Sequence, residues 1–108
     1  MKEIAQYEIL VVNLDPTIGS EIKKTRPCVV VSPNEINRHL RTIIIAPITS
    51  QSKPYPTRVP IFFKEKNSWI VVEQIRTIDK QRAFRKLGRL QEEEIVRLKA
   101  VIKETLVD

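Results

Sequence analysis

Glycine is scarce in this chain of 108 residues, which contains only Gly19 and Gly88. Phosphate-binding loops of the P-loop or dinucleotide type need several closely spaced glycines, because their backbone must approach the phosphates. Cysteine and histidine are scarcer still, with only Cys28 and His39. A metal site would need these residue types clustered with carboxylates. The sequence therefore predicts neither a nucleotide-binding loop nor a metal centre, and we expect no cofactor.

Long apolar runs are also lacking. No run approaches the roughly 18 residues needed to span a bilayer, and the N-terminus carries acids and lacks the apolar stretch of a signal peptide. The single Cys28 cannot form an internal disulfide, which fits a reducing compartment. We therefore expect a cytoplasmic protein with no membrane segment.

The residues that are present describe an ordinary globular protein. Hydrophobic residues make up 42% and charged residues 30%, so a packed core is expected. The length fits a single domain spanning residues 1–108. The net charge of +6 favours a polyanionic partner such as nucleic acid.

Short apolar runs separated by turn residues indicate a mainly β protein. The run Pro27–Ser32 is too apolar to have a wet face and is predicted as a central strand. Pro60 cannot donate a ladder hydrogen bond, so its run is expected at a sheet edge. The predicted strands are Tyr7–Leu14, Pro27–Ser32, Arg41–Ile48, Thr57–Phe63, Ser68–Ile75 and a weaker Lys86–Leu90, with a helical turn at Pro33–Leu40.

The C-terminal segment Gln91–Asp108 has the pattern of an amphipathic helix. Apolar residues recur at three- and four-residue spacing, and acids in the first turn complement the helix dipole. The apolar stripe consists of Ile95, Leu98, Val101, Ile102 and Leu106. Strands followed by one helix predict an α+β, mainly β fold, in which a small, strongly bent antiparallel sheet or barrel is closed by the C-terminal helix.

Three polar segments at strand ends are candidate sites, and each has a structural alternative. The segment DPTIGSEIKKTRP (residues 15–27) is longer than a hairpin requires, but an ordinary surface loop has the same composition. The hydroxyls in APITSQS (46–52) could act on a ligand or simply cap turns. The charges in EQIRTIDK (73–80) could bind a ligand or pair with one another. His39 is expected to be a solvated surface residue.

The ordered motifs identify a family. NLDPTIGSEIKKTRPCVVVS, NR, APITSQ, VP, EQIRTIDKQR and KLGRL, taken together, closely resemble the MazF/PemK toxin endoribonucleases of bacterial type II toxin–antitoxin pairs. The resemblance runs from about Tyr7 to Leu106. It implies a compact CcdB/PemK-type barrel, related to SH3-like folds, that works as a homodimer. It also implies sequence-specific, metal-independent cleavage of single-stranded RNA (mRNA), which inhibits translation and growth. A cognate antitoxin would inhibit the toxin by laying an acidic, disordered tail in the RNA-binding groove.

The resemblance also assigns catalytic residues. The arginine of the TRP motif falls on Arg26, and the threonine of APITSQ falls on Thr49. Some members carry a catalytic histidine before the acid of the first loop, where this chain has Ser20 followed by Glu21. Those members also use an acid before the glutamine of the third motif, which here is Glu73. The serine aligns this chain with the members that rely on arginine and threonine.

Metal-free RNA cleavage needs a 2′-hydroxyl to attack its own phosphate, giving a 2′,3′-cyclic phosphate and a 5′-hydroxyl. Arginine keeps its proton below a pKa of about 12, so Arg26 is expected to stabilise the growing phosphate charge, with proton donation as a second role. Thr49 would donate a hydrogen bond to the same phosphate. Glu21 or Glu73 could accept the 2′-proton, or alignment and charge stabilisation could suffice.

RNA binding is assigned to polar residues around this pair. Lys23, Lys24, Arg76 and Arg82 are predicted phosphate contacts, whereas Ser50, Gln51 and Gln74 can read base edges, and Ser20 joins the same set. With only six aromatic residues, base stacking is expected to be limited to Tyr55 or Phe62.

Two other classes of function stay open. A CcdB-like gyrase inhibitor would share the fold without cutting RNA and would bind its partner mainly through the C-terminal helix. A catalytically silent RNA- or protein-binding module of the SH3-like type would not need both Arg26 and Thr49. The proline after Arg26 disfavours a helical backbone for the arginine, which is therefore expected to lie extended where the loop meets the sheet.

Overall fold

The computed structural model describes residues 3–14 and 25–108. Seven strands are present in this part of the chain: β1 (Glu8–Asn13), β2 (Thr25–Val30), β3 (Thr42–Thr49), β4 (Arg58–Phe63), β5 (Lys66–Val71), β6 (Arg76–Asp79) and β7 (Ala83–Arg89). The helices are α1 (Asn34–His39) and α2 (Glu92–Ile102), with 3-10 turns at Val72–Gln74 and Lys80–Arg82 and a π-helical turn at Lys103–Val107. None of these helices is long and apolar enough to cross a membrane.

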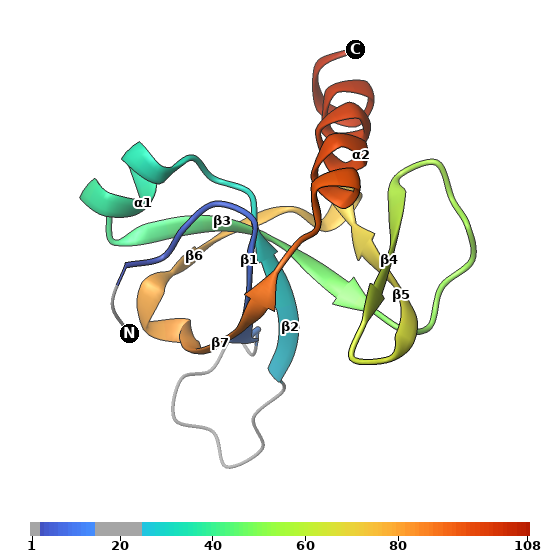
Figure 1. Ribbon diagram of the computed structural model, residues 1–108. Coiled ribbons are helices and arrows are strands. Elements are labelled where there is room, and N and C mark those ends of the chain that lie inside the picture. Colours follow the sequence, from blue (N-terminus) through green and yellow to red (C-terminus); the bar gives the residue numbers. More distant parts are fainter. Residues whose placement is uncertain (1–2, 15–24) are drawn as a thin grey trace.

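The strands form one antiparallel sheet that curls into a half-barrel (Figure 1). The strand order is β4-β5-β3-β2-β1-β7, and β6 pairs with β3 outside that path. Strand β2 therefore lies in the middle and β4 at an edge, as the sequence predicts. The mainly β fold closed by a C-terminal helix is confirmed.

Strand β3 is the bend of the half-barrel. Its first half pairs with β6 at Thr42–Ile45, and its last two residues pair with β5 at Ile48 and Thr49. Pro47 lies at the step between these two partners, where a missing N–H is tolerated. The strand therefore continues past the proline to Thr49, rather than ending at Ile48 as predicted.

Two apolar clusters cover the two faces of the sheet. The first contains Val29, Ala46 and Ile70 and is covered by Ile95 and Leu98 of α2. Burial of a side chain such as Leu98 stabilises the fold by about 1.5–3 kcal/mol. The second cluster contains Leu10, Val12, Cys28, Val30, Ile43, Ile45 and Ile78 and includes no residue of α2. Helix α2 therefore covers only the face of the sheet that carries the first cluster, and the second cluster lies on the other face.

The predicted C-terminal helix is present and begins with a capping box. The Gln91 backbone N–H donates to Glu94 Oε1 at 2.8 Å. The other carboxylate oxygen of Glu94 accepts the backbone N–H of Phe62 at 3.3 Å, which ties the helix to edge strand β4. Leu106 was predicted on the buried stripe but is 54% exposed. It lies in the π-helical turn Lys103–Val107, which has no buried residue and departs from the 3.6-residue period of the prediction.

Other strand boundaries also differ from the prediction. Strand β2 was predicted as Pro27–Ser32, but it begins at Thr25, because Thr25 and Arg26 still pair with β1, and it ends at Val30. The predicted strand Ser68–Ile75 ends at Val71 and gives way to a 3-10 turn, and the weak strand Lys86–Leu90 begins earlier, at Ala83. Strand β6 was not predicted. It has only four residues, and Ile78 is the only buried one, so its alternation is too brief to stand out.

Candidate active site

The sheet register brings Arg26 and Thr49 next to each other. Strands β2 and β3 pair with Cys28 opposite Pro47, and continuing this antiparallel register by two residues places Arg26 opposite Thr49. On the other side, Arg26 pairs with Val12 of β1. Directly opposed residues of antiparallel strands project from the same face. The two residues assigned to catalysis therefore share one end and one face of the sheet.

This face is the one that α2 does not cover. Side chains alternate along a strand, so Arg26 projects on the same side as Cys28 and Val30, which belong to the second apolar cluster. The arginine itself is exposed at the start of β2, whereas Cys28 is fully buried. The apolar end of β2 thus fixes the backbone that carries the charged guanidinium, which extends into solvent.

Arg26 and Thr49 line two neighbouring hollows. The larger, of about 560 Å³, also takes in Ser50, Lys64 and Lys66. Its cationic side chains come from two separate parts of the sheet, the start of β2 and the hairpin that joins β4 to β5. A hollow with several cations and hydroxyls suits a phosphate-bearing ligand.

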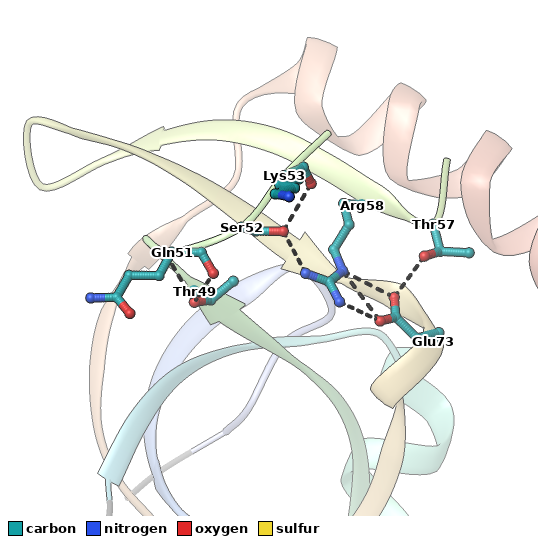
Figure 2. A network of polar contacts seen from close by, with 7 residues as sticks. All are labelled: Thr49, Gln51, Ser52, Lys53, Thr57, Arg58 and Glu73. Carbon is teal, nitrogen blue, oxygen red and sulfur yellow. Dashed lines mark hydrogen bonds and ion pairs between the residues drawn. The ribbon is translucent and has the colours of Figure 1, made fainter. Parts of the chain in front are cut away.

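The smaller hollow, of about 260 Å³, is lined by Arg26 and Thr49 together with Gln51, Arg58 and Gln74. The glutamines carry both donors and acceptors, which suits the edges of unpaired bases. Figure 2 shows the wall of this region formed by the end of β3, the connection to β4 and the turn after β5.

The Thr49 hydroxyl is part of a tight turn. Its Oγ1 accepts the backbone N–H of Gln51 at 3.1 Å and can donate to the Gln51 carbonyl at 3.3 Å (Figure 2). The first contact fixes the oxygen, while the second is long and easily exchanged for a better acceptor. The hydroxyl therefore caps the turn, as the structural alternative predicts, and its role toward a ligand stays a prediction.

Glu73 pairs with Arg58, not with its sequence neighbours. Arg58 Nη2 lies 2.6 Å from Glu73 Oε2, and Arg58 Nε lies 3.2 Å from each carboxylate oxygen (Figure 2). The Thr57 hydroxyl donates to Glu73 Oε1 at 2.7 Å. The Arg58 hydrogen bonds are the main cause that lowers the pKa of Glu73 from 4.5 to about 2, and the same carboxylate raises the pKa of Arg58.

This pairing bears on one of the two alternatives for the segment 73–80. Its charges could have paired with one another, but the partner of Glu73 comes from β4. Asp79 caps the following turn by accepting the Gln81 backbone N–H at 2.8 Å, and Lys80 Nζ donates to the carbonyl of Asn37.

The pKa of the Cys28 thiol reflects two nearby positive charges. Burial raises the pKa of its thiol to about 12, while the charges of Arg26 and Arg76 act in the opposite direction. Arg76, at the start of β6, is therefore close enough to share the electrostatic environment of Cys28 with Arg26. A thiol in this state is not a nucleophile at neutral pH.

The remaining predicted residues lie away from the pair Arg26 and Thr49 or outside the described part of the chain. Arg82 is half-buried in the turn before β7, which pairs with β1 on the side away from β2. Its Nη1 donates to the Asn13 carbonyl at 3.4 Å. Tyr55 and Phe62 are 51% and 67% exposed, and Phe62 lines a separate hollow with Trp69. Ser20, Glu21, Lys23 and Lys24 lie outside the described residues. His39 is exposed, as expected.

Three cations of the site were missed by sequence reasoning. Arg58 lines the smaller hollow, and Lys64 and Lys66 line the larger one. Arg58 could have been identified from the sequence, because it stands at the junction between a polar loop and a strand, as Arg26 does. Lys64 stands in the hairpin with a φ of 50°, in a position that sequence alone does not relate to the site.

The fold is a curled antiparallel half-barrel, and the hollow at its open end carries cations and hydroxyls that suit a phosphate-bearing ligand. Comparison with known proteins gives its family. The sequence profile described as "PemK-like, MazF-like toxin of type II toxin-antitoxin system" matches residues 5–106. The chain belongs to this family of toxins.

Characterised relatives and solved structures agree with this assignment. The chain is 38% identical to "Endoribonuclease EndoA" of Bacillus subtilis over 96 residues, covering 83% of each chain. It is 34% identical to "Endoribonuclease toxin MazF" of Escherichia coli K12 over 96 residues, covering 88% of this chain and 86% of the relative. The crystal structure of MazF from Deinococcus radiodurans has a TM-score of 0.81 at 21% identity, covering 98% of both chains, and supports the fold.

Proposed function

We propose that this MazF-like endoribonuclease cleaves single-stranded RNA, including mRNA, without a metal ion, and that the hollows around Arg26 and Thr49 form its active site. The observation that carries this proposal is the sheet register, which brings the two side chains together on one exposed face. A donor fork and a hydroxyl that point into one hollow suit a phosphate whose charge grows during reaction.

The reaction follows from these groups. The 2′-oxygen attacks the adjacent phosphorus, the bond from phosphorus to the 5′-oxygen breaks, and the products are a 2′,3′-cyclic phosphate and a 5′-hydroxyl. Arg26 stabilises the charge on the non-bridging oxygens, and the Thr49 hydroxyl exchanges the Gln51 carbonyl for one of these oxygens. The arginine can also supply the proton that the leaving 5′-oxygen requires.

Glu73 is a weak candidate for the base. Its carboxylate accepts bonds from Arg58 and Thr57, and a pKa of about 2 makes it a poor proton acceptor. Glu21 stays a prediction for this role. Without a dedicated base, the 2′-proton passes to solvent water, and alignment of the 2′-hydroxyl and charge stabilisation at the phosphate lower the barrier.

Binding extends over the remaining polar residues. Lys64, Lys66 and Arg76 add positive charge around Arg26, and Lys23, Lys24 and Arg82 are further phosphate contacts in this proposal. Ser50, Gln51 and Gln74, together with Ser20, read bases and make cleavage sequence-specific. Cutting mRNA at short sequences would inhibit translation and growth, which defines the chain's role as a toxin.

Two protein partners complete the proposal: a second copy of this chain, giving a homodimer, and a cognate antitoxin. A structural neighbour is titled "Endoribonuclease in complex with its cognate antitoxin from Mycobacterial species" and has a TM-score of 0.82 at 17% identity, covering 95% of this chain and 94% of that one. An acidic antitoxin tail would meet the same cations as RNA, so the two ligands should compete. We place the toxin in the cytoplasm, where mRNA is found.

The test is incubation of the purified protein with a long single-stranded RNA in EDTA. We expect discrete fragments with 5′-hydroxyl ends, which disappear in Arg26→Ala and Thr49→Ala variants that keep the wild-type circular dichroism spectrum. Absence of cleavage of any RNA would overturn the proposal. Arrest of gyrase under the same conditions would instead support the CcdB-like alternative, which the family assignment does not favour.

A further inference from the structure

The connection between β3 and β4 lies beside the active site and has little apolar packing of its own. It comprises residues 50–57, and most of its side chains, including Ser50, Gln51 and Tyr55, are exposed. No residue of this connection belongs to either apolar cluster described above. Its conformation must therefore be held by polar contacts.

Arg58 makes three of these contacts. Its Nη1 donates to the Ser52 hydroxyl, and its backbone N–H donates to the Tyr55 carbonyl at 3.0 Å. The guanidinium carbon also lies 5.2 Å from the centre of the Tyr55 ring, within the range of a cation–π contact. Figure 2 shows the guanidinium between Ser52 on one side and Glu73 on the other.

Glu73 fixes this guanidinium in turn. Nε and Nη2 both face its carboxylate, and the Arg58 side chain is only 16% exposed. The carboxylate itself is held by the Thr57 hydroxyl, and Thr57 is tied to the turn after β5 by the hydrogen bond from the Val72 N–H to its carbonyl at 3.0 Å. The donor fork is thus occupied on both sides, and Arg58 is placed to orient the connection rather than to bind a phosphate.

We propose that Arg58 and Glu73 are positioning residues that hold the connection 50–57 in one conformation, so that Ser50 and Gln51 meet the RNA bases in a fixed geometry. The pair then sets the selectivity of cleavage more than its rate. This inference rests on the proposed ribonuclease function and deepens it.

The separation of selectivity from rate follows from how Thr49 is held. Thr49 is the last residue of β3 and pairs with Trp69 of β5, so it keeps its place when the connection loosens. Ser50 and Gln51 lie beyond the last pair of β3 with β5. The Thr49 hydroxyl holds Gln51 on the β3 side, and Arg58 holds the next residue, Ser52, on the far side. Loss of the ion pair should therefore disturb base recognition before it disturbs the phosphate site.

The test compares cleavage of the preferred site with cleavage of its single-base variants in a randomised single-stranded RNA. Arg58→Met and Glu73→Gln should each reduce this discrimination about tenfold, the scale of one lost charge-assisted hydrogen bond. The single-turnover rate at saturating preferred RNA should change less than about threefold, so the loss appears in KM rather than kcat. The double variant should resemble Arg58→Met, because that single variant has already lost the ion pair with Glu73.

Arg97→Met is the matched control, since it removes one positive charge from the exposed surface of α2 and should leave discrimination unchanged. Amide hydrogen exchange tests the same point without RNA. The Tyr55 and Arg58 N–H groups, both bonded within the connection, should exchange about tenfold faster in Glu73→Gln. If Arg58→Met fails to fold, Glu73→Gln and Ser52→Ala provide the same comparison.

Unchanged discrimination and unchanged exchange in Glu73→Gln would overturn the inference while the wild-type protein still cut RNA. An equal fall of the single-turnover rate and of discrimination would also overturn the inference, because the pair would then act on catalysis itself. Failure of the wild-type protein to cut RNA would instead overturn the proposed function, and the exchange measurement would still report on the connection.

Discussion

Arg26 and Arg58 line the same hollow, but their charges have different surroundings. Arg58 is held by a carboxylate, a hydroxyl and an aromatic ring, and its donor fork is occupied. Arg26 forms no ion pair with any carboxylate within residues 3–14 and 25–108, and it stands exposed at the end of a buried strand. The same type of side chain is thus a fixed part of the scaffold in one place and, in the proposed function, an anion site in the other.

Replacing each arginine by lysine tests most directly whether Arg26 and Arg58 have different roles. Arg26→Lys keeps the charge but loses the fork, and we expect cleavage to fall about 10²- to 10³-fold. Arg58→Lys should change the single-turnover rate less than about threefold, because its role is to orient the connection. Single-turnover rates on one preferred RNA measure both. Equal losses in the two variants would contradict the distinction.

Thr49 extends the comparison to the hydroxyl that shares the hollow. Thr49→Val preserves shape and removes the donor, so we expect about a 10²-fold loss in rate. Thr49→Ser keeps the oxygen that accepts the Gln51 N–H and should retain most of the activity. The same single-turnover assay applies. A valine variant as active as the serine variant would exclude the hydroxyl from the reaction.

Acid should reveal the Arg58 pair through stability. A carboxyl whose pKa is lowered on folding stabilises the fold above its unfolded pKa, near 4.5, and loses that effect as the pH falls toward its folded pKa of about 2. Both side chains are partly solvated, so we expect only about 1 kcal/mol at pH 7. Urea unfolding of the wild type and of Glu73→Gln, from pH 7 to pH 2.5, should show two curves that converge below pH 5. A difference that stays constant with pH would contradict the assignment.

Salt dependence offers the smallest effect and the finest distinction. Each phosphate neutralised by the protein contributes about −0.7 to the slope of log affinity against log salt concentration for single strands. Binding of an RNA with a 2′-deoxy group at the cut site should therefore lose about 0.7 of slope in Arg26→Met. Arg58→Met should lose much less, since Glu73 already neutralises that charge. A salt-independent affinity of the wild type would contradict the cationic hollow.

Much of the fold could be predicted because each strand carries its own signal. The apolar run in β2, the proline in β4 and the periodicity of α2 each reflect burial or a missing donor, which are local properties. Strand β6 lacked such a signal, because a four-residue strand with one buried side chain has almost no pattern. The exposed Leu106 was missed because a π-helical turn changes the angle between successive residues.

Part of the candidate site could likewise be predicted from the sequence, and part could not. Arg26 and Thr49 were identified from motifs, and the register explains why residues 23 positions apart meet. The pairing of Arg58 with Glu73 depends on how β4 and β5 align, with Arg58 opposite Val71, two residues before Glu73. A sequence shows both charges but not this alignment, so the pairing of Glu73 with Arg58 could not be predicted when Glu73 was interpreted as a possible base.

The register of β2 against β3 also has an evolutionary consequence. Insertions in the connections would leave Arg26 opposite Thr49, whereas a one-residue insertion within either strand would turn one of them to the face covered by α2. Substitutions can accumulate in the segment 50–57 without changing Arg26 or Thr49. Descendants of one such toxin can therefore diverge in the sequences they cut while inheriting the same chemistry.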